Sequence, residues 1–261
     1  MLLGSPLIRK QLDSRRKHSI YRRKSFSLKS DLEQLNRRIA LRKDFYLFLR
    51  PFELADSIGF SNQFDGKPKS LISFEEALSR SIDAGGKRTV FCVGDGKERW
   101  GVANITFDDN LWMHEIVKFF KASVAIISMP GRSDGCINES TLIRNVPELL
   151  RKTVFVIPPL SCYTKDTRKS AVDMKSYFTD VRSKHKTIGL EIPEARSDSG
   201  LFFTLSGATG RVERQLEWQR VVFKEVHKSF WGSTRQESIT SVVPTLTANR
   251  IRAALQLASV S

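Results

Sequence analysis

The feature that most constrains the fold is a series of short apolar runs, each of strand length and each followed by a turn rich in polar residues, glycine or proline. Runs of this kind are typical of strands that are buried on both faces of a parallel sheet. Segments with helical spacing separate most of them, and this alternation predicts an α/β fold with a doubly wound parallel sheet. The predicted strands lie at 44–50, 88–93, 103–107, 122–128 and 152–157.

The predicted helices follow from capping residues and apolar spacing. Ser73 and Glu76 have the spacing of a capping box at the start of a helix. A second helix is capped at 109–110, and a third, from 138 to 150, should be interrupted at Pro147. Farther along the chain we expect helices at 171–183, 212–230 and 247–257, and strands at 187–191 and 201–205.

This pattern divides the chain into four parts. We predict a basic, mobile arm (1–29), a docking helix (30–43), an α/β domain (44–210) and C-terminal helices (211–261). The docking helix is predicted from Leu32, Leu35 and Ile39, which recur at helical spacing. The fold class is therefore a doubly wound sheet with helical additions at both ends.

Positive charge is concentrated at the start of the chain. The net charge is +15, from 43 Lys and Arg against 28 Asp and Glu, and 13 of the basic but only 3 of the acidic residues precede Asp44. An arm with few apolar anchors and this much charge is a candidate site for nucleic acid or another polyanion. An anionic membrane surface and a solvated tail without a fixed partner are the alternatives. The candidate residues are Arg15, Arg16, Lys17, Arg22, Arg23 and Lys24.

Several protein classes are excluded by what the sequence lacks. No apolar run approaches the ~20 residues that cross a bilayer, and the start does not have the pattern of a secretory signal. Cys92, Cys136 and Cys162 have neither disulfide-framework nor zinc spacing, and the histidines are scattered, so we expect no metal site and a cytoplasmic location. The lack of a phosphate-loop lysine motif excludes a nucleoside triphosphatase.

The ligand site is expected at the carboxyl ends of the strands, where open α/β sheets bind their ligands. Four segments there, 50–53, 94–96, 129–139 and 158–159, contain functional residue types that a packed core would not need. In the second segment, Gly94 and Gly96 let backbone amides approach a phosphate, and Asp95 is placed to hold ribose hydroxyl groups. A plain tight turn is the alternative.

Glu139 follows a glycine-containing loop and is expected in the first turn of the next helix, facing the same edge of the sheet. A carboxylate there could stabilise an oxocarbenium charge, or attack an anomeric carbon, when an N-glycosidic bond breaks. The alternative is that Glu139 only complements the positive end of its helix. Asp109 and Trp112 are candidates for a wall on which a base stacks, although Trp112 would equally suit the core.

Taken in order, five motifs resemble those of a bacterial family of TIR-like domains. These domains are flavodoxin-like sheets, related in architecture to TIR NAD hydrolases and to nucleoside deoxyribosyltransferase-like enzymes. The resemblance covers about residues 44–160, with Gly96 where proline is common in the family and Asn138 where tryptophan is common. The motifs are Phe-Leu-Arg-x-Phe-Glu (48–53), Val-Gly-Asp-Gly (93–96), Asp-Asp-x-x-Trp (108–112), Gly-x-x-x-Glu (135–139) and Lys-Thr-Val-Phe-Val-Ile-Pro-Pro (152–159).

The resemblance implies that Glu139 carries glycosidic chemistry on a nucleotide such as NAD. The resulting hypothesis is a nucleotide N-glycosidase, either an NAD hydrolase or a deoxyribosyltransferase-like enzyme, acting as a toxic effector in anti-phage defence. It needs no cofactor beyond its substrate, and the family implies a homo-oligomer or a subunit of a defence complex. The alternatives are a non-catalytic module that senses nucleotides or binds nucleic acid, and a scaffold. The substrate-binding candidates are Arg50, Phe52, Gly94, Asp95, Asp109, Trp112, Arg132 and Ser133.

Overall fold

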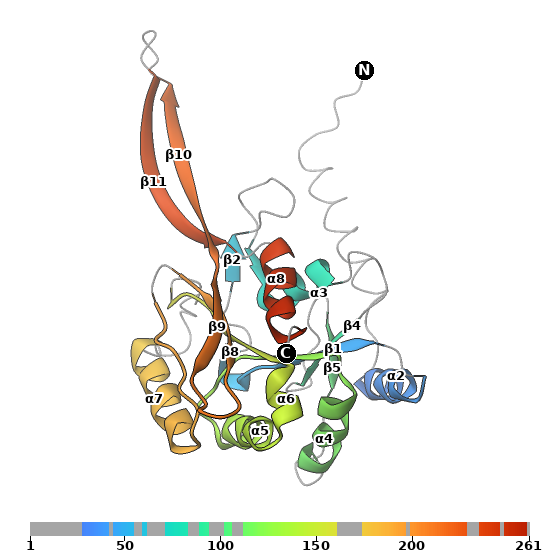
Figure 1. Cartoon of the computed structure of the whole chain (residues 1–261). Helices are drawn as coiled ribbons and strands as arrows, with labels where there is room; N and C mark the ends of the chain where they lie inside the picture. Colours follow the sequence, from blue (N-terminus) through green and yellow to red (C-terminus); the bar gives the residue numbers. More distant parts are fainter. Residues whose placement is uncertain are drawn as a thin grey trace, which may run out of the picture.

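One seven-stranded sheet runs through the computed structural model of the chain (Figure 1). The residues described are 28–41, 44–54, 59–61, 71–82, 89–93, 102–105, 112–160, 174–196, 199–228, 235–245 and 248–259. In spatial order the strands are β5 (Ala103–Ile105), β4 (Thr89–Val93), β1 (Phe45–Leu49), β6 (Ala125–Ser128), β7 (Thr153–Ile157), β8 (Leu201–Leu205) and β9 (Val212–Glu217). Neighbours from β5 to β7 are parallel, whereas β8 and β9 pair antiparallel. The predicted α/β fold with a mostly parallel sheet is confirmed.

The winding of the sheet reverses between β1 and β6. Leu49, at the end of β1, lies opposite Val93 of β4 on one side and Ser128 of β6 on the other. From β1 the chain builds β4 and β5 outward in one direction and then crosses back to build β6 and β7 in the other. Apart from the three-residue edge strand β5, the parallel strands follow the order of flavodoxin-like sheets.

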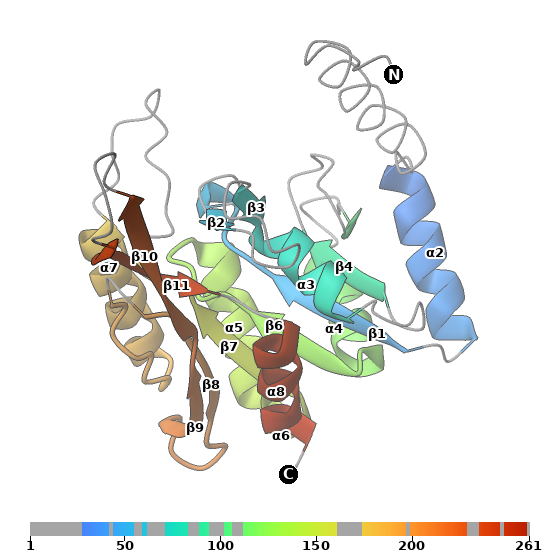
Figure 2. The ribbon, with the colours of Figure 1, turned by 90° about the horizontal axis from the view of Figure 1, so that it is seen from above.

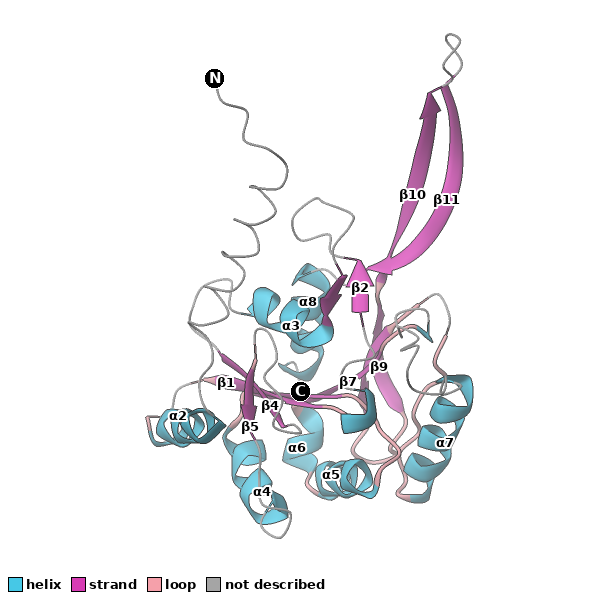
Figure 3. Ribbon diagram, turned by 180° about the vertical axis from the view of Figure 1, so that it is seen from behind, coloured by secondary structure: helices cyan, strands magenta, loops and turns pink. Residues whose placement is uncertain are grey.

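Helices cover both faces of the sheet (Figure 2). The face that bears α3 (Phe74–Ile82) also bears α8 (Ala248–Ser259), and these two helices pack together. The opposite face bears α4 (Trp112–Ala122), α5 (Asp134–Asn145) and α6 (Pro147–Arg151), as Figures 1 and 3 show. Of the helices that the structure describes, none combines the length and apolar character needed to cross a bilayer.

Two predicted features of the helices are confirmed. The backbone N–H of Glu76 donates a hydrogen bond of 3.2 Å to Ser73 Oγ, so Ser73 caps α3. The interruption at Pro147 separates α5 from α6. The segment predicted as a docking helix (30–43) overlaps α2 (Leu28–Ala40), which packs beside β5 and buries Leu35.

Aromatic side chains fill the space between the sheet and the helices that cover it. Phe48 of β1 packs 5.2 Å from Phe74 of α3, measured between ring centroids. Trp218, which follows β9, lies 6.2 Å from Phe74 and 5.9 Å from Phe202 of β8. Because Trp218 touches both α3 and the antiparallel end of the sheet, it joins the two halves of the core.

The helix predicted over 212–230 is wrong, because this segment forms β9 and β10 (Gln219–Lys228). Along β9 half-buried residues alternate with exposed ones, which is the two-residue period of a strand. The sheet therefore continues past residue 210, where we expected the domain to end. β10 pairs with β11 (Arg235–Thr245) in an antiparallel hairpin that projects from the body of the molecule (Figures 1 and 3).

Two smaller expectations also differ from the structure. The strand predicted at 187–191 is absent, because α7 (Met174–Thr187) runs into a turn in which Gly189 has a φ of 74°. The helix expected from 138 already begins at Asp134. Because α5 begins at Asp134, Glu139 lies farther from the N-terminal end of this helix than predicted. A small two-stranded sheet of β2 (Gly59–Ser61) and β3 (Leu71–Ser73) completes the described strands.

We predict that Gly200→Ala destabilises the protein by about 1–3 kcal/mol through overpacking. A Cβ at this position would lie 2.6 Å from Cε2 of Trp218 and 2.8 Å from Cδ of Pro159. The control is Gly207→Ala, since nothing lies within 4 Å of a Cβ there. Urea unfolding of both variants measures the difference, and equal stabilities would show that Trp218 is not packed against this backbone.

Candidate active site

The candidate site lies where β1 and β6 leave the sheet side by side. The N–H of Met129, after β6, donates a hydrogen bond of 2.8 Å to the carbonyl oxygen of Leu49. A Cβ on Gly131 would lie 2.6 Å from Cγ of Pro51 and 2.7 Å from Sγ of Cys136. Glycine is therefore needed at 131 for the two exit segments and the start of α5 to meet. This is the switch point at which ligands bind in sheets of this kind.

Arg50 is buried beneath this contact and is paired with Glu75 of α3. Its Nη1 lies 2.9 Å from Glu75 Oε1, and its Nε donates a hydrogen bond of 3.2 Å to Cys92 Sγ. Both charged side chains are almost completely buried. The Arg50 guanidinium thus links β1 to α3 and β4. Phosphate binding by Arg50 stays a prediction. A cavity of about 10 Å³ beside the pair is large enough for about one water.

Glu139 lies in the second turn of α5 and is half-buried. Burial raises the pKa of its carboxyl group to about 8, so the group holds its proton at neutral pH. Asp134, whose side chain is 99% exposed, is the acidic residue in the first turn of α5. The expectation that Glu139 lies in the first turn is therefore wrong, and complementing the helix end does not explain this residue.

Cys136 lies one helical turn before Glu139 on the same helix. Burial, with a smaller contribution from the charges of Glu139 and Glu53, raises the pKa of its thiol to about 12. The Ser133 hydroxyl donates a hydrogen bond of 3.2 Å to the sulfur. Burial likewise raises the pKa of the Cys92 thiol to about 12. Both thiols are protonated at neutral pH, which is unfavourable for nucleophilic catalysis.

Sequence reasoning missed a polar cluster beside the β1–β6 contact. The Tyr177 hydroxyl, on α7, donates a hydrogen bond of 3.1 Å to Oε1 of Glu53. The Arg132 guanidinium lies 5.0 Å from the centroid of the Tyr177 ring, 4.0 Å from Glu53 and 3.5 Å from Asp180. Burial and the charge of Glu53 both raise the pKa of Tyr177. Glu53 was visible in the Phe-Leu-Arg-x-Phe-Glu motif, but nothing in the sequence pointed to Tyr177.

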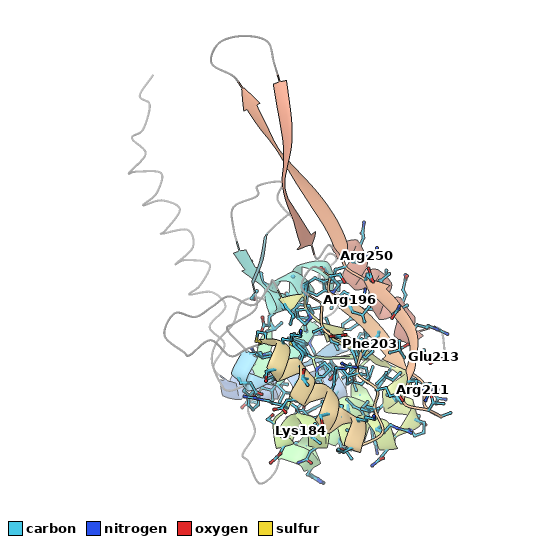
Figure 4. The ribbon with its side chains drawn as sticks, turned by 90° about the vertical axis from the view of Figure 1, so that its left-hand side faces the viewer. Lys184, Arg196, Phe203, Arg211, Glu213 and Arg250 are labelled. Atoms are coloured by element: carbon cyan, nitrogen blue, oxygen red, sulfur yellow. The ribbon has the colours of Figure 1, made fainter. Side chains whose placement is uncertain are left out.

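A second contact fastens α7 to α5 next to Glu139. His185 Nδ1 donates a hydrogen bond of 2.8 Å to the Val181 carbonyl oxygen, so the neutral ring accepts one of 3.1 Å at Nε2 from the Ser140 hydroxyl. Both side chains are buried. Lys184, labelled on α7 in Figure 4, donates a hydrogen bond of 2.7 Å to the Arg132 carbonyl oxygen. Helix α7 therefore holds three parts of the site together.

The structure brings together some of the predicted site residues. Glu139, Arg132 and Ser133 lie around the β1–β6 contact, with Arg50 buried below it, and Phe52 is 53% exposed beside Glu53. Trp112 begins α4, but its side chain is not among those described. Gly94, Asp95 and Asp109 lie outside the described residues, as do the arm residues Arg15, Arg16, Lys17, Arg22, Arg23 and Lys24.

Comparisons of the chain with protein-family models, with curated proteins and with solved structures found no match. The site is therefore interpreted from its own residues. Within the described ranges, no group of three or more His, Cys, Asp and Glu side chains is arranged to hold a metal ion.

We predict that Gly131→Ala lowers the free energy of unfolding by about 1–3 kcal/mol, because the new methyl group overlaps Pro51 and Cys136. The matched control is Gly135→Ala, four residues later, where nothing lies within 4 Å of a Cβ. That change should be neutral or stabilise α5 by up to about 1 kcal/mol. Denaturant unfolding measures the free energy of unfolding of both variants. A Gly131→Ala protein as stable as the wild type would contradict the close contact between the segments that follow β1 and β6.

We also predict that stability falls as the pH drops below about 6.5. Burial lowers the pKa of His185 below the 6.5 of an unperturbed histidine, so below that pH the unfolded chain binds more protons than the folded one. The unfolding free energy of His185→Gln should be lower at pH 7.5 and should change less between pH 7.5 and 5.5. His114→Gln, at an exposed position on α4, should keep the wild-type pH dependence. If the unfolding free energy of His185→Gln changed with pH as much as that of the wild type, His185 would not be the cause of the pH dependence.

Proposed function

We propose that the protein cleaves the N-glycosidic bond of a nucleoside or nucleotide, with Glu139 as the carboxyl group that carries the chemistry. The observation that supports this most is the combination of place and protonation. A half-buried carboxyl group that keeps its proton at neutral pH lies at the switch point of an α/β sheet. The motif resemblance to TIR-like and deoxyribosyltransferase-like enzymes supports the same reaction at the same residue.

The chemistry requires a group that can act in two forms. As the bond between C1′ and the base nitrogen breaks, its electron pair goes to the base and positive charge develops on the sugar. A protonated Glu139 donates its proton to the departing nitrogen. The resulting carboxylate then stabilises the oxocarbenium charge. A carboxyl group fully exposed to water would be ionised at neutral pH and could not supply the first of these steps.

The protonation of Glu139 also separates the two substrate classes. An uncharged purine or pyrimidine nucleoside needs a proton on its leaving base, whereas nicotinamide leaves NAD as a neutral molecule and needs none. We therefore expect the turnover of uncharged nucleosides to fall as the pH rises through about 8, where Glu139 ionises. NAD cleavage should rise over the same range, because the ionised carboxylate assists it.

The test is to incubate the protein with NAD, and separately with nucleosides and nucleotides, and to measure the released bases by chromatography from pH 6 to 9. We predict that Glu139→Gln lowers turnover by about 10²–10⁴-fold, the usual size of an acid–base contribution. The control Asp134→Asn, one turn earlier on α5, should keep the wild-type rate. Wild-type protein that releases no base, or a Glu139→Gln variant that is as active as wild type, would contradict the proposal.

Nucleotide binding by Glu139→Gln distinguishes the enzyme from the alternative, a non-catalytic nucleotide sensor. If wild type and Glu139→Gln bind the same nucleotide equally and neither releases a base, the result favours the non-catalytic nucleotide sensor over the enzyme. Calorimetric titration of both proteins with each candidate nucleotide provides this comparison.

A further inference from the structure

Glu53 is the second carboxylate at the β1–β6 switch point. It lies in the 3₁₀ turn η1 (Phe52–Leu54), directly after the end of β1. This turn is fixed, because the Leu54 N–H donates a hydrogen bond of 3.1 Å to the Pro51 carbonyl oxygen and the Leu54 side chain is buried. The side chain of Glu53 is 36% exposed, so a ligand and water can reach it.

Glu53 and Glu139 approach the same point from different elements. Both residues lie near Cys136, because their charges raise the pKa of its thiol. A Cβ on Gly131 would lie 2.7 Å from the Cys136 sulfur and 2.6 Å from Cγ of Pro51, two residues before Glu53. Glu53 approaches this thiol from the β1 exit, two residues after Pro51, and Glu139 approaches it from α5. The two carboxyl groups therefore flank the contact where β1 and β6 leave the sheet.

The surroundings of the two groups are different in kind. The Arg132 guanidinium lies 4.0 Å from the carboxylate of Glu53, which also accepts the hydrogen bond from Tyr177. Glu139 is instead half-buried on α5, and this burial raises its pKa. Glycoside hydrolysis uses two carboxyl groups in different surroundings, one as its acid and the other as its base.

We propose that Glu53 is the base that activates the attacking water, while Glu139 is the acid that protonates the leaving base. This inference rests on the proposed function and adds the second catalytic group. The water oxygen bonds to C1′ and its proton passes to the Glu53 carboxylate. At the same time the C1′–N bond breaks, its electron pair goes to the base nitrogen, and that nitrogen takes the proton of Glu139. Exchange of one proton through solvent then restores both groups.

Tyr177 is a positioning residue in this scheme. Its hydroxyl holds one oxygen of Glu53 and leaves the carboxylate anchored to α7, which α5 holds in turn through Ser140 and His185. Removing the hydroxyl leaves the base present but less well oriented. The competing explanation is that Glu53 has only a structural role, in which it connects η1 to α7 through Tyr177. The experiment has to distinguish this role from that of a catalytic base.

The experiment measures kcat and KM of wild type, Glu53→Gln and Tyr177→Phe on a nucleoside that the wild type cleaves, with and without sodium azide. Azide is an anionic nucleophile that needs no base. We expect Glu53→Gln to lower kcat by about 10²–10⁴-fold with little change in KM. Azide should restore its turnover and yield a glycosyl azide. Azide should not restore Glu139→Gln, and Tyr177→Phe should lower kcat by a smaller factor than Glu53→Gln.

The control is Glu191→Gln, which removes another glutamate paired with an arginine, the exposed pair of Glu191 with Arg211 at 3.2 Å. It should keep the wild-type kcat. A Glu53→Gln protein with wild-type kcat, or one with low kcat that azide does not rescue, overturns this inference alone. A wild type that releases no base overturns the proposed function, and this inference with it. If Glu53→Gln does not fold, Tyr177→Phe decides, because unchanged kcat in that variant overturns the scheme.

Discussion

The rest of the site depends on the buried ion pair between Arg50 and Glu75. Burying two charges is costly unless they compensate each other at close range, so the end of β1 and the start of α3 have to meet in one arrangement. The Ser73 cap determines where α3 begins and thereby places Glu75. Because Arg50 is fixed in this way, the next residues, as far as Glu53, leave the sheet in a defined direction toward Cys136 and α5.

Helix α7 supplies the second constraint, and it acts from outside the sheet. Tyr177 reaches Glu53, Lys184 reaches the backbone of Arg132, and His185 reaches Ser140, so one helix contacts the exits of β1 and β6 and the helix that bears Glu139. The differing environments of the two carboxyl groups follow from this packing. Glu139 is half-buried on α5, and Glu53 is held by the Arg132 guanidinium and the Tyr177 hydroxyl.

Most of the sheet and part of the site could be predicted from local pattern. Strands such as Phe45–Leu49 and Thr153–Ile157 are apolar throughout because they are buried on both faces, and a capping hydroxyl acts within three residues. The segment 212–230 forms strands instead of the predicted helix, because its mixed polar and apolar residues do not by themselves select one period. Pairing with β8 stabilises the two-residue period of a strand in β9.

The sequence by itself determined the buried parallel strands, the cap of α3 and the presence of a carboxyl group at position 139. It determined these because strand burial, turns and caps depend on residues close together in the chain. The tertiary structure alone decided that Glu139 is enclosed enough to keep its proton, and that Glu53 meets Tyr177, 124 residues away. Desolvation and long-range contacts depend on how distant elements pack, and no local spacing of residues records that packing.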